Sequence, residues 1–263
     1  MISHYIVTTV YDASPELITR ARCWSEKLHT DYIPRERRSI AALMNIFNTE
    51  IIVVGANEGP IIYTPGGKYF FHLSMAELRI KNLINGKHDH MVTAMGLAPG
   101  MSVLDCTLGL ASDAIVASYV TGTEGTIVGL EHSPILSLVA EEGLQTFASG
   151  DIKLAAALRR IRVHQTDYLN YLKELPDNSF DIVFFDPMFR EPVTSSSNLK
   201  PLRYLADSRP LDYDALKQAV RVASTRVVVK EKRNSTVFNE LGIFRFIGGR
   251  YSSIQYGVLE VDI

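Results

Sequence analysis

The pattern of hydrophobic and polar positions changes near Pro99-Gly100. From there on, short apolar runs alternate with segments of helical periodicity, an order typical of a doubly wound, mostly parallel sheet. The runs that predict strands are Ser102–Asp105, Thr126–Glu131, Ile161–His164, Phe180–Asp186, Arg226–Lys230, Phe244–Ile247 and Ile254–Val261. The segments that predict helices between them are Ser112–Val120, Pro134–Phe147, Tyr168–Leu175 and Leu211–Ala223. We therefore expect an α/β fold with a seven-stranded sheet, whose last two strands form an antiparallel hairpin at its edge.

The first part of the chain has a pattern of its own. Strands are predicted over Tyr5–Val10 and Glu50–Val54, with a helix that begins at Ser14-Pro15 and a second helix over Arg37–Asn48. One or two further helices are expected over residues 74–97. The sequence thus predicts a small N-terminal α/β subdomain over residues 1–72 and a larger domain over residues 73–263.

The run Phe180–Asp186 ends abruptly in Pro187-Met188-Phe189. Proline lacks an N–H group and fixes φ, so the strand is expected to stop at Asp186. Ligands of open α/β sheets bind at the carboxyl ends of the strands. There, the Asp186 carboxylate and the Pro187 carbonyl could hold the hydrogens of an aromatic amine while Phe189 stacks on its ring. The alternative is a turn in which Phe189 closes the core.

Three other predicted strands also lead into carboxylates. Asp105 precedes the loop that contains Gly109, and this loop lacks the GxGxxG pattern of a pyrophosphate site. An acid at that strand tip suits a ligand with an amino group, such as S-adenosylmethionine (SAM), and disfavours a nicotinamide dinucleotide. Glu131 can accept hydrogen bonds from both ribose hydroxyls. Asp167, which follows Thr166, could accept from an adenine amino group or simply cap the next helix.

The charge of the chain bears on whether it binds nucleic acid. The net charge of −2 gives no general attraction to nucleic acid, so RNA would have to be bound by local basic clusters. The candidate clusters are Arg35, Arg37 and Arg38; Lys200, Arg203 and Arg209; and Lys230, Lys232 and Arg233. The second of these lies in the serine-rich segment 190–210, which we expect to be a long loop that closes over the substrate.

The sequence does not indicate a metal site, a disulfide framework or a membrane segment. The chain has two cysteines, Cys23 and Cys106, and this count excludes a disulfide framework, while His88-Asp89-His90 has poor spacing for a metal. The chain has no apolar run of membrane length and no secretory signal pattern. We therefore expect a cytoplasmic protein without a metal or a membrane partner.

The motifs together resemble class I SAM-dependent methyltransferases. The loop Leu104–Gly109 is similar to their cofactor loop, Leu130-Glu131 to their ribose-binding acid, and Gln165-Thr166-Asp167 to their adenine-side position. More narrowly, the Asp186–Phe189 turn and the run Arg226–Lys230 resemble the RsmJ (YhiQ) family of bacterial 16S rRNA guanine-N2 methyltransferases. The spacing from Asp105 to Asp113 is a further point of similarity.

This resemblance implies a Rossmann-like methyltransferase sheet, SAM as cofactor, and 16S rRNA or the small ribosomal subunit as partner. The implied cofactor contacts are Asp105, Thr107, Gly109, Ser112, Asp113, Glu131, His132, Thr166, Asp167 and Asp186, and the implied catalytic residues are Asp186, Pro187 and Phe189. The chain departs from the family at Ser112, where members carry Arg, and at Arg190-Glu191-Pro192, where members continue with Pro-His and a lysine-rich run.

Two other functions stay open on the sequence alone. One is a small-molecule methyltransferase of the same fold. The other is a non-catalytic RNA-binding or ribosome-assembly factor that retains the cofactor pocket.

Overall fold

The computed structural model describes residues 4–187, 200–207 and 209–261. By its internal contacts the chain divides into two compact units. The described residues of the first are 4–72, 134–147 and 200–206, and those of the second are 73–133, 148–187, 207 and 209–261. Phe189, Arg190 and the serine run that follows lie outside the described residues.

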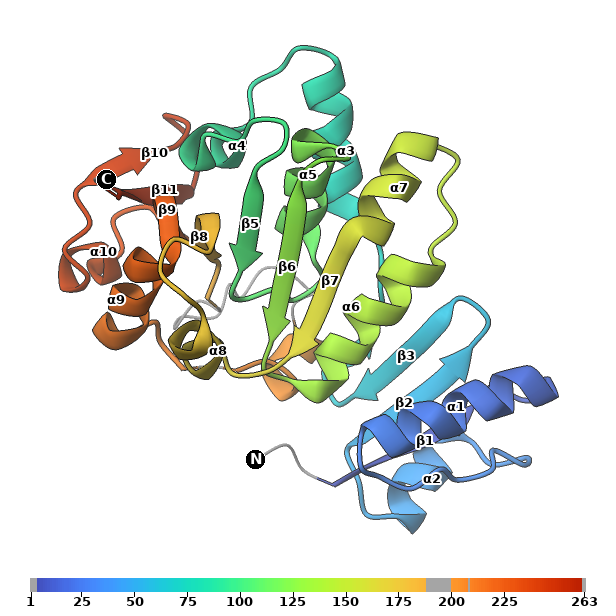
Figure 1. Ribbon diagram of the computed structural model, residues 1–263. Helices are drawn as coiled ribbons and strands as arrows, with labels where there is room; N and C mark the ends of the chain where they lie inside the picture. Colours follow the sequence, from blue (N-terminus) through green and yellow to red (C-terminus); the bar gives the residue numbers. More distant parts are fainter. Residues whose placement is uncertain (1–3, 188–199, 208, 262–263) are drawn as a thin grey trace. The chain divides into compact units, whose positions relative to one another are not determined.

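The first unit contains a four-stranded sheet in the order β1 (Tyr5–Thr9), β2 (Ile51–Ala56), β3 (Gly59–Thr64) and β4 (Gly67–Tyr69) (Figure 1). β1 pairs with β2 in parallel, and the other pairs are antiparallel. The helices of this unit are α1 (Pro15–Lys27), α2 (Ile40–Ile46), α6 (Pro134–Thr146) and the short 3-10 helix Pro201–Tyr204. As Ser14-Pro15 predicts, the Ser14 hydroxyl caps α1 by accepting from the Leu17 amide.

The second unit contains a seven-stranded sheet. Its order is β10 (Arg245–Ile247), β11 (Ile254–Glu260), β9 (Ala223–Lys232), β8 (Phe180–Phe185), β5 (Ser102–Asp105), β6 (Thr126–Glu131) and β7 (Ile161–Gln165). The pairs from β9 to β7 are parallel, whereas β11 runs antiparallel to both β9 and β10. The predicted doubly wound, mostly parallel sheet and its terminal hairpin are therefore confirmed.

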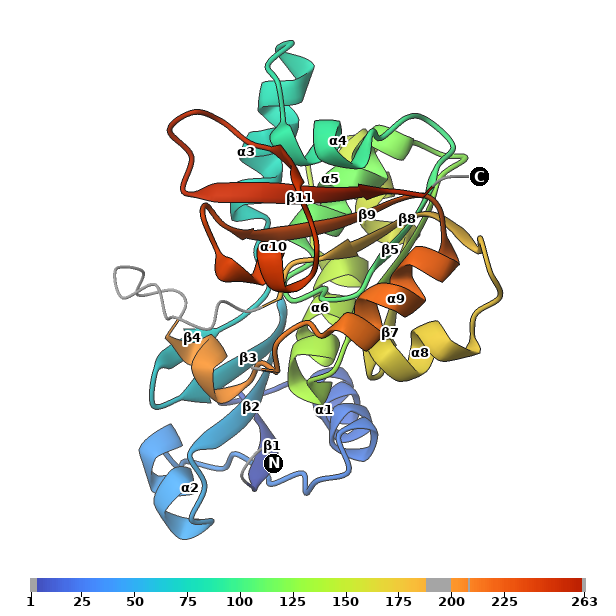
Figure 2. The ribbon, with the colours of Figure 1, turned by 90° about the vertical axis from the view of Figure 1, so that its left-hand side faces the viewer.

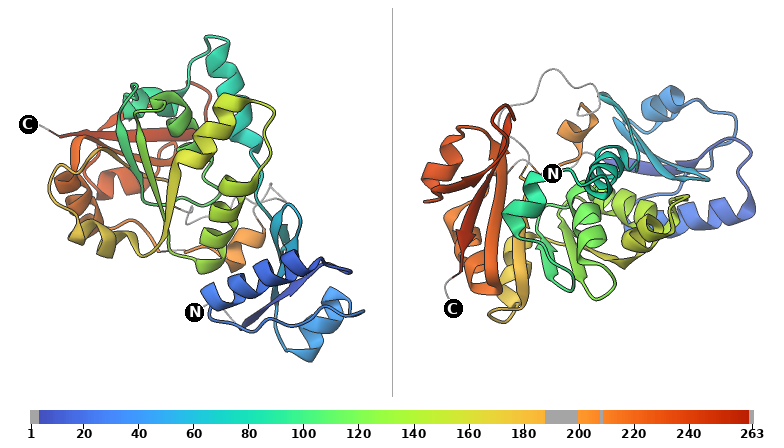
Figure 3. Two further views of the ribbon diagram at one scale, coloured as in Figure 1. Left: turned by 45° about the vertical axis from the view of Figure 1, so that its right-hand side comes forward. Right: turned by 90° about the horizontal axis from the view of Figure 1, so that it is seen from above.

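Helices cover this sheet in two groups. The helices of the second unit are α3 (Ser74–Ile84), α4 (His90–Met95), α5 (Ser112–Thr121), α7 (Ile152–Arg160), α8 (Tyr168–Glu174), α9 (Tyr213–Val222) and α10 (Thr236–Glu240). α5 packs against α3 and α7, while α9 packs against α8 and against strands β8 and β9. Figure 2 shows α8 and α9 side by side, and the left view of Figure 3 shows them across the sheet from α7. Strand β8 is buried through its last residues, Phe184 and Phe185, as its continuous apolar run predicts.

Some predicted boundaries were wrong. The second helix begins at Ile40 rather than Arg37, because Glu36 adopts a positive φ of 47° and Ser39 then caps the helix. β8 ends at Phe185, one residue before Asp186. Helix α7 was not predicted, although Asp151 is a good N-cap and the alanine-rich sequence after it favours a helix. Strand β4 and helix α10 were missed as well, since each is very short.

Candidate active site at the carboxyl edge of the seven-stranded sheet

The site lies where strands β5 and β8 end side by side. These strands are parallel neighbours, and the sheet order reverses between them, so their carboxyl ends form the switch point at which such sheets bind ligands. The two loops that leave them are tied together. The Cys106 amide donates to the Phe184 carbonyl over 2.9 Å, and the Asp186 amide donates to the Thr107 hydroxyl over 2.6 Å. These bonds fix Asp186 next to the loop that follows Asp105.

Asp105 is a buried carboxyl at the end of β5, with 2% of its surface exposed. One of its oxygens, Oδ1, accepts from the Thr107 amide over 3.0 Å. Burial raises the pKa of Asp105 well above its usual range, and the nearby negative charges of Asp113 and Asp186 raise it further. A cation bound beside this group would favour its ionised form, which suits a ligand that carries an ammonium group.

Gly109 and Glu131 form the next part of the site. Gly109 has a φ of +52°, its Cβ position faces open space, and its amide donates to Glu131 Oε2 over 3.0 Å. The other carboxylate oxygen, Oε1, accepts from the Ser133 amide over 2.8 Å. Burial raises the pKa of Glu131 although these amide hydrogen bonds oppose the effect. Each oxygen keeps a lone pair, so the fixed carboxylate can still accept from two hydroxyls.

The predicted adenine-side residues lie at the ends of β6 and β7. The Thr166 amide donates to the Glu131 carbonyl over 3.0 Å, and His132 lies half-exposed with its Nδ1 atom 4.0 Å from Asp167. Asp167 caps helix α8 by accepting from the Asn170 amide, and its Oδ2 atom pairs with Arg209 over 2.7 Å. Burial works against ionisation here, but Arg209 holds the pKa of Asp167 below its ordinary value. Asp167 therefore caps the helix, which was one of the two interpretations that the sequence allowed.

Asp113 and Asp186 belong to a network of ion pairs. Ser112 and Asp113 begin helix α5. The Asp113 carboxylate pairs with Arg79 over 2.5 Å through Oδ1 and with Lys230 over 2.8 Å through Oδ2. The same Lys230 ammonium lies 2.6 Å from Asp186 Oδ2. This lysine thus joins the first turn of α5 to the turn after β8.

The network separates the two carboxyls in acidity. For Asp113, burial opposes ionisation, but Lys230 and Arg79 together lower its pKa to about 2. For Asp186, burial dominates over Lys230, and the charge of Asp113 adds to it, so the pKa rises to about 6. The two carboxylates raise the pKa of Lys230 in spite of its burial, so its ammonium stays protonated.

The sequence of the chain matches a known protein family. Residues 70–245 of the 263 match the family model described as "Putative SAM-dependent methyltransferase". The chain belongs to this family of SAM-dependent methyltransferases. Its cofactor is accordingly SAM, which supplies an activated methyl group on a sulfonium centre.

Individual proteins are similar to the chain over most of its length. The methyltransferase is 38% identical to the uncharacterized protein YpiP of Bacillus subtilis, over 98% of its own length and 100% of that of the relative. It is 27% identical to ribosomal RNA small subunit methyltransferase J of Pseudomonas aeruginosa, over 85% and 84% of the two chains. For the protein of that name from Coxiella burnetii, the values are 31%, 65% and 66%. A SAM-dependent methyltransferase from Neisseria gonorrhoeae has the same fold, with a TM-score of 0.66 at 15% identity over 97% and 96% of the chains.

The residues at the sheet edge fit this cofactor. SAM carries an ammonium and a sulfonium charge, and the buried Asp105 carboxyl lies at the switch point without an ion pair among the contacts described above. SAM also carries two ribose hydroxyls, and Glu131 is held by two amides in a fixed position on the neighbouring strand. The open space beside Gly109 leaves room for a close approach of the ligand to the backbone.

Several residues of the site were missed or differently interpreted from the sequence. Lys230 was grouped with Lys232 and Arg233 as a possible phosphate contact, but it is largely buried and pairs with two carboxylates. Arg79 is not a candidate from the sequence, because helix periodicity says nothing about a partner on another helix. The available signal for Lys230 was a charged residue directly after three buried valines of a central strand.

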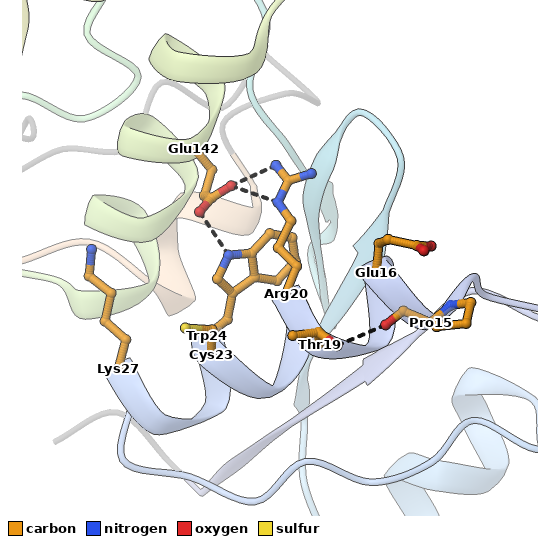
Figure 4. A pocket seen from close by; sticks show the side chains of 8 residues that line it. All are labelled: Pro15, Glu16, Thr19, Arg20, Cys23, Trp24, Lys27 and Glu142. Carbon is orange, nitrogen blue, oxygen red and sulfur yellow. Dashed lines mark hydrogen bonds and ion pairs between the residues drawn. The ribbon is translucent and has the colours of Figure 1, made fainter.

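A pocket of about 630 Å³ lies elsewhere, in the first unit (Figure 4). It is lined by helix α1 and by Glu142 of α6. Glu142 accepts from Arg20 and from the Trp24 indole, over 2.6 and 2.8 Å. None of the predicted site residues lines it. The pocket therefore does not bear on the chemistry at the switch point.

The part of the chain that the structure describes contains no cluster of three or more His, Cys, Asp or Glu side chains arranged to hold a metal. None of its helices combines the length and apolar character needed to cross a bilayer.

Proposed function

We propose that this methyltransferase transfers the methyl group of SAM to the exocyclic amine, N2, of a guanine in small-subunit ribosomal RNA. The observation that carries the proposal is the Asp186-Pro187 turn at the switch point, where a carboxylate held by Lys230 is available to an amine. The similarity to ribosomal RNA small subunit methyltransferase J of two organisms supports the choice of substrate.

Asp105 would bind the ammonium group of SAM, and Glu131 would accept hydrogen bonds from the ribose hydroxyls. Thr107 and Gly109 would line the loop against the cofactor, and Ser112 would face it from the start of α5. His132, Thr166 and Asp167 would lie on the adenine side. Asp113 forms an ion pair through each oxygen, with Arg79 and with Lys230, and we assign it the supporting role of holding these two cations.

The target amine needs activation, since its lone pair is delocalised into the purine ring. Hydrogen-bond acceptors that hold both N2 hydrogens localise this lone pair and aim it at the methyl carbon. Lys230 binds Oδ2 of Asp186, so we assign Oδ1 to one hydrogen and the Pro187 carbonyl to the other. We also retain Phe189 as the ring that would stack on the base, which requires an unpaired or flipped nucleotide.

The reaction balances without a further reactant. The N2–CH3 bond forms as the S–CH3 bond breaks, and the sulfonium becomes a neutral thioether. The methylated nitrogen then loses one proton. Asp186, with a pKa raised to about 6, is suited to accept this proton and release it to water.

The test is methylation of purified small ribosomal subunits with methyl-tritiated SAM, followed by nucleoside mass spectrometry. The proposal predicts label in N2-methylguanosine, and a yield that falls steeply with added salt because phosphate contacts weaken. Label on another base would contradict the assignment of N2. Label only in small molecules of a cell extract would favour a small-molecule methyltransferase, and binding of the subunits without any label would favour a non-catalytic factor.

A further inference from the structure

Five side chains of alternating charge form one continuous chain of ion pairs in the second unit. They run from Asp89 to Arg79, from Arg79 to Asp113, from Asp113 to Lys230, and from Lys230 to Asp186. The four contacts measure 2.7, 2.5, 2.8 and 2.6 Å, and the exposed fraction of these side chains ranges from 8% for Asp113 to 28% for Asp186. We call this set the relay.

The far end of the relay is anchored on backbone. Asp89 caps helix α4 by accepting from the amides of Met91 and Val92, and Arg79 grips its two oxygens over 2.7 and 3.0 Å. A guanidinium held at two points by a helix cap has little freedom. Its remaining nitrogen, Nη1, therefore presents a fixed donor to Asp113.

The near end of the relay rests on strand β9. Strand β9 has a neighbour on each side. It pairs with β11, where Tyr256 is the register partner of Lys230, and it pairs in parallel with β8. An ammonium group has three donors, and two of them reach Asp113 and Asp186. Asp113 is itself fixed by Arg79. A movement of the Lys230 ammonium toward Asp113 would therefore break its contact with Asp186.

We propose that Lys230 is a positioning residue for methyl transfer, which orients the Asp186 carboxylate and keeps it ionised so that it can accept a hydrogen of the target amine. Asp113, Arg79 and Asp89 act through Lys230 by fixing its ammonium. The inference rests on the proposed function, in which Asp186 receives the amine. It adds residues that the sequence motifs did not assign to the reaction.

The charges that face Asp186 come from two strands and one helix. Lys230 favours the ionised form, whereas Asp113 of α5 and Glu231 of β9 disfavour it, and Asp105 at the end of β5 is also negative when ionised. Lys230 is in direct contact with Asp186. Its removal would leave a partly buried carboxylate among other carboxylates, which raises the pKa of Asp186.

The test compares the variants Lys230→Met and Lys230→Arg, with Lys81→Met as a matched control. Lys81 is an exposed lysine of α3 that pairs with Glu77, one turn away on the same helix. Loss of a contacting cation raises a carboxyl pKa by about 1 to 3 units. For a rise of about 2 units, kcat of Lys230→Met falls about tenfold at pH 7 and recovers toward the wild-type value near pH 9 to 10.

Lys230→Arg keeps the charge, so the acid limb of its pH profile should stay close to that of the wild type. The affinity of all variants for S-adenosylhomocysteine should change by less than about threefold. If Lys230 served only the fold, the loss of kcat would be equal at every pH and would accompany a lower melting temperature. That result, or an unchanged profile in a folded Lys230→Met variant, overturns the proposal.

A second measurement keeps the relay separate from the choice of substrate. Carbon-13 NMR of labelled aspartate side chains, assigned with Asp186→Asn, reports the titration of Asp186 in the cofactor-bound protein without any RNA. A rise in its pKa in Lys230→Met supports the relay even if ribosomal RNA proves not to be the substrate. An unchanged titration overturns the relay even if the methylation of ribosomal RNA is observed.

Discussion

The Nζ atom of Lys230 lies 2.6 Å from Oδ2 of Asp186, although the two residues are 44 positions apart in the chain. Parallel pairing of β8 with β9 brings them to the same edge of the sheet. The contact favours the ionised form of the carboxyl that we assign to the target amine, against the effect of its burial.

The pH dependence of the wild-type enzyme follows from this carboxyl. Only the ionised form of Asp186 can accept a hydrogen of the amine, and its pKa is raised to about 6. We expect kcat to be constant above this value and to fall about tenfold per pH unit below it. Single-turnover methylation at a series of pH values measures this limb. A rate that stays level down to pH 4.5 contradicts the role of Asp186.

Asp105→Asn should separate cofactor binding from stability. Asparagine keeps an acceptor for the Thr107 amide but removes the charge that would bind the SAM ammonium. A charged hydrogen bond contributes about 1.5–3 kcal/mol, so S-adenosylhomocysteine should bind roughly 10- to 100-fold more weakly by calorimetry.

The same substitution should raise the melting temperature of the protein without cofactor. The pKa of Asp105 is higher in the folded state than in the unfolded state, so folding is penalised as pH rises through the folded value. Asparagine removes this penalty at neutral pH. By the same linkage, wild-type affinity for S-adenosylhomocysteine should weaken as pH falls and Asp105 becomes protonated. If the Asp105→Asn variant binds S-adenosylhomocysteine with unchanged affinity, Asp105 does not bind the cofactor.

Asp167 can be tested for its two roles with a pair of variants. Asp167→Ala removes the cap of α8 and should lower the free energy of unfolding by about 1 kcal/mol, whereas Asp167→Ser retains a capping hydroxyl. If the side chain also contacts the cofactor, both variants should bind S-adenosylhomocysteine more weakly. If both variants bind S-adenosylhomocysteine as tightly as the wild type, the role of Asp167 is limited to capping α8 and pairing with Arg209.

The strand-end acids could be predicted from sequence, because Asp105, Glu131 and Asp186 each follow or end an apolar run and parallel strands share one carboxyl edge. The ion pairs of the relay could not be predicted from the sequence. Arg79 reaches its partners from a helix with no local signal, and the pairing of Lys230 depends on which strands become neighbours. Asp167 was ambiguous for another reason, since a helix cap and a ligand contact use the same residue type.

The first unit offers a test of packing in which local and tertiary effects have opposite signs. In the middle of α6, Gly143→Ala should stabilise the helix by about 1 kcal/mol on propensity alone. However, the new methyl group would overlap Cβ and Cγ of Phe71, which packs edge-on against Phe147. We therefore expect a net loss of about 1–3 kcal/mol in chemical unfolding.

Gly150→Ala is the matched control for this substitution, because its Cβ would meet nothing within 4 Å. Its free energy of unfolding should stay within about 0.5 kcal/mol of the wild type. A stabilised Gly143→Ala variant would show that the Phe71 contact is not formed.

The central claim is that this SAM-dependent methyltransferase modifies a guanine amine of small-subunit ribosomal RNA through Asp186. Its most direct test is mass-spectrometric mapping of that RNA from a strain that lacks the gene, complemented with wild type or with Asp186→Asn. We predict that one N2-methylguanosine is lost on deletion, returns with the wild type and stays absent with Asp186→Asn. A methylation map that is unchanged by the deletion, or one restored by Asp186→Asn, would contradict the claim.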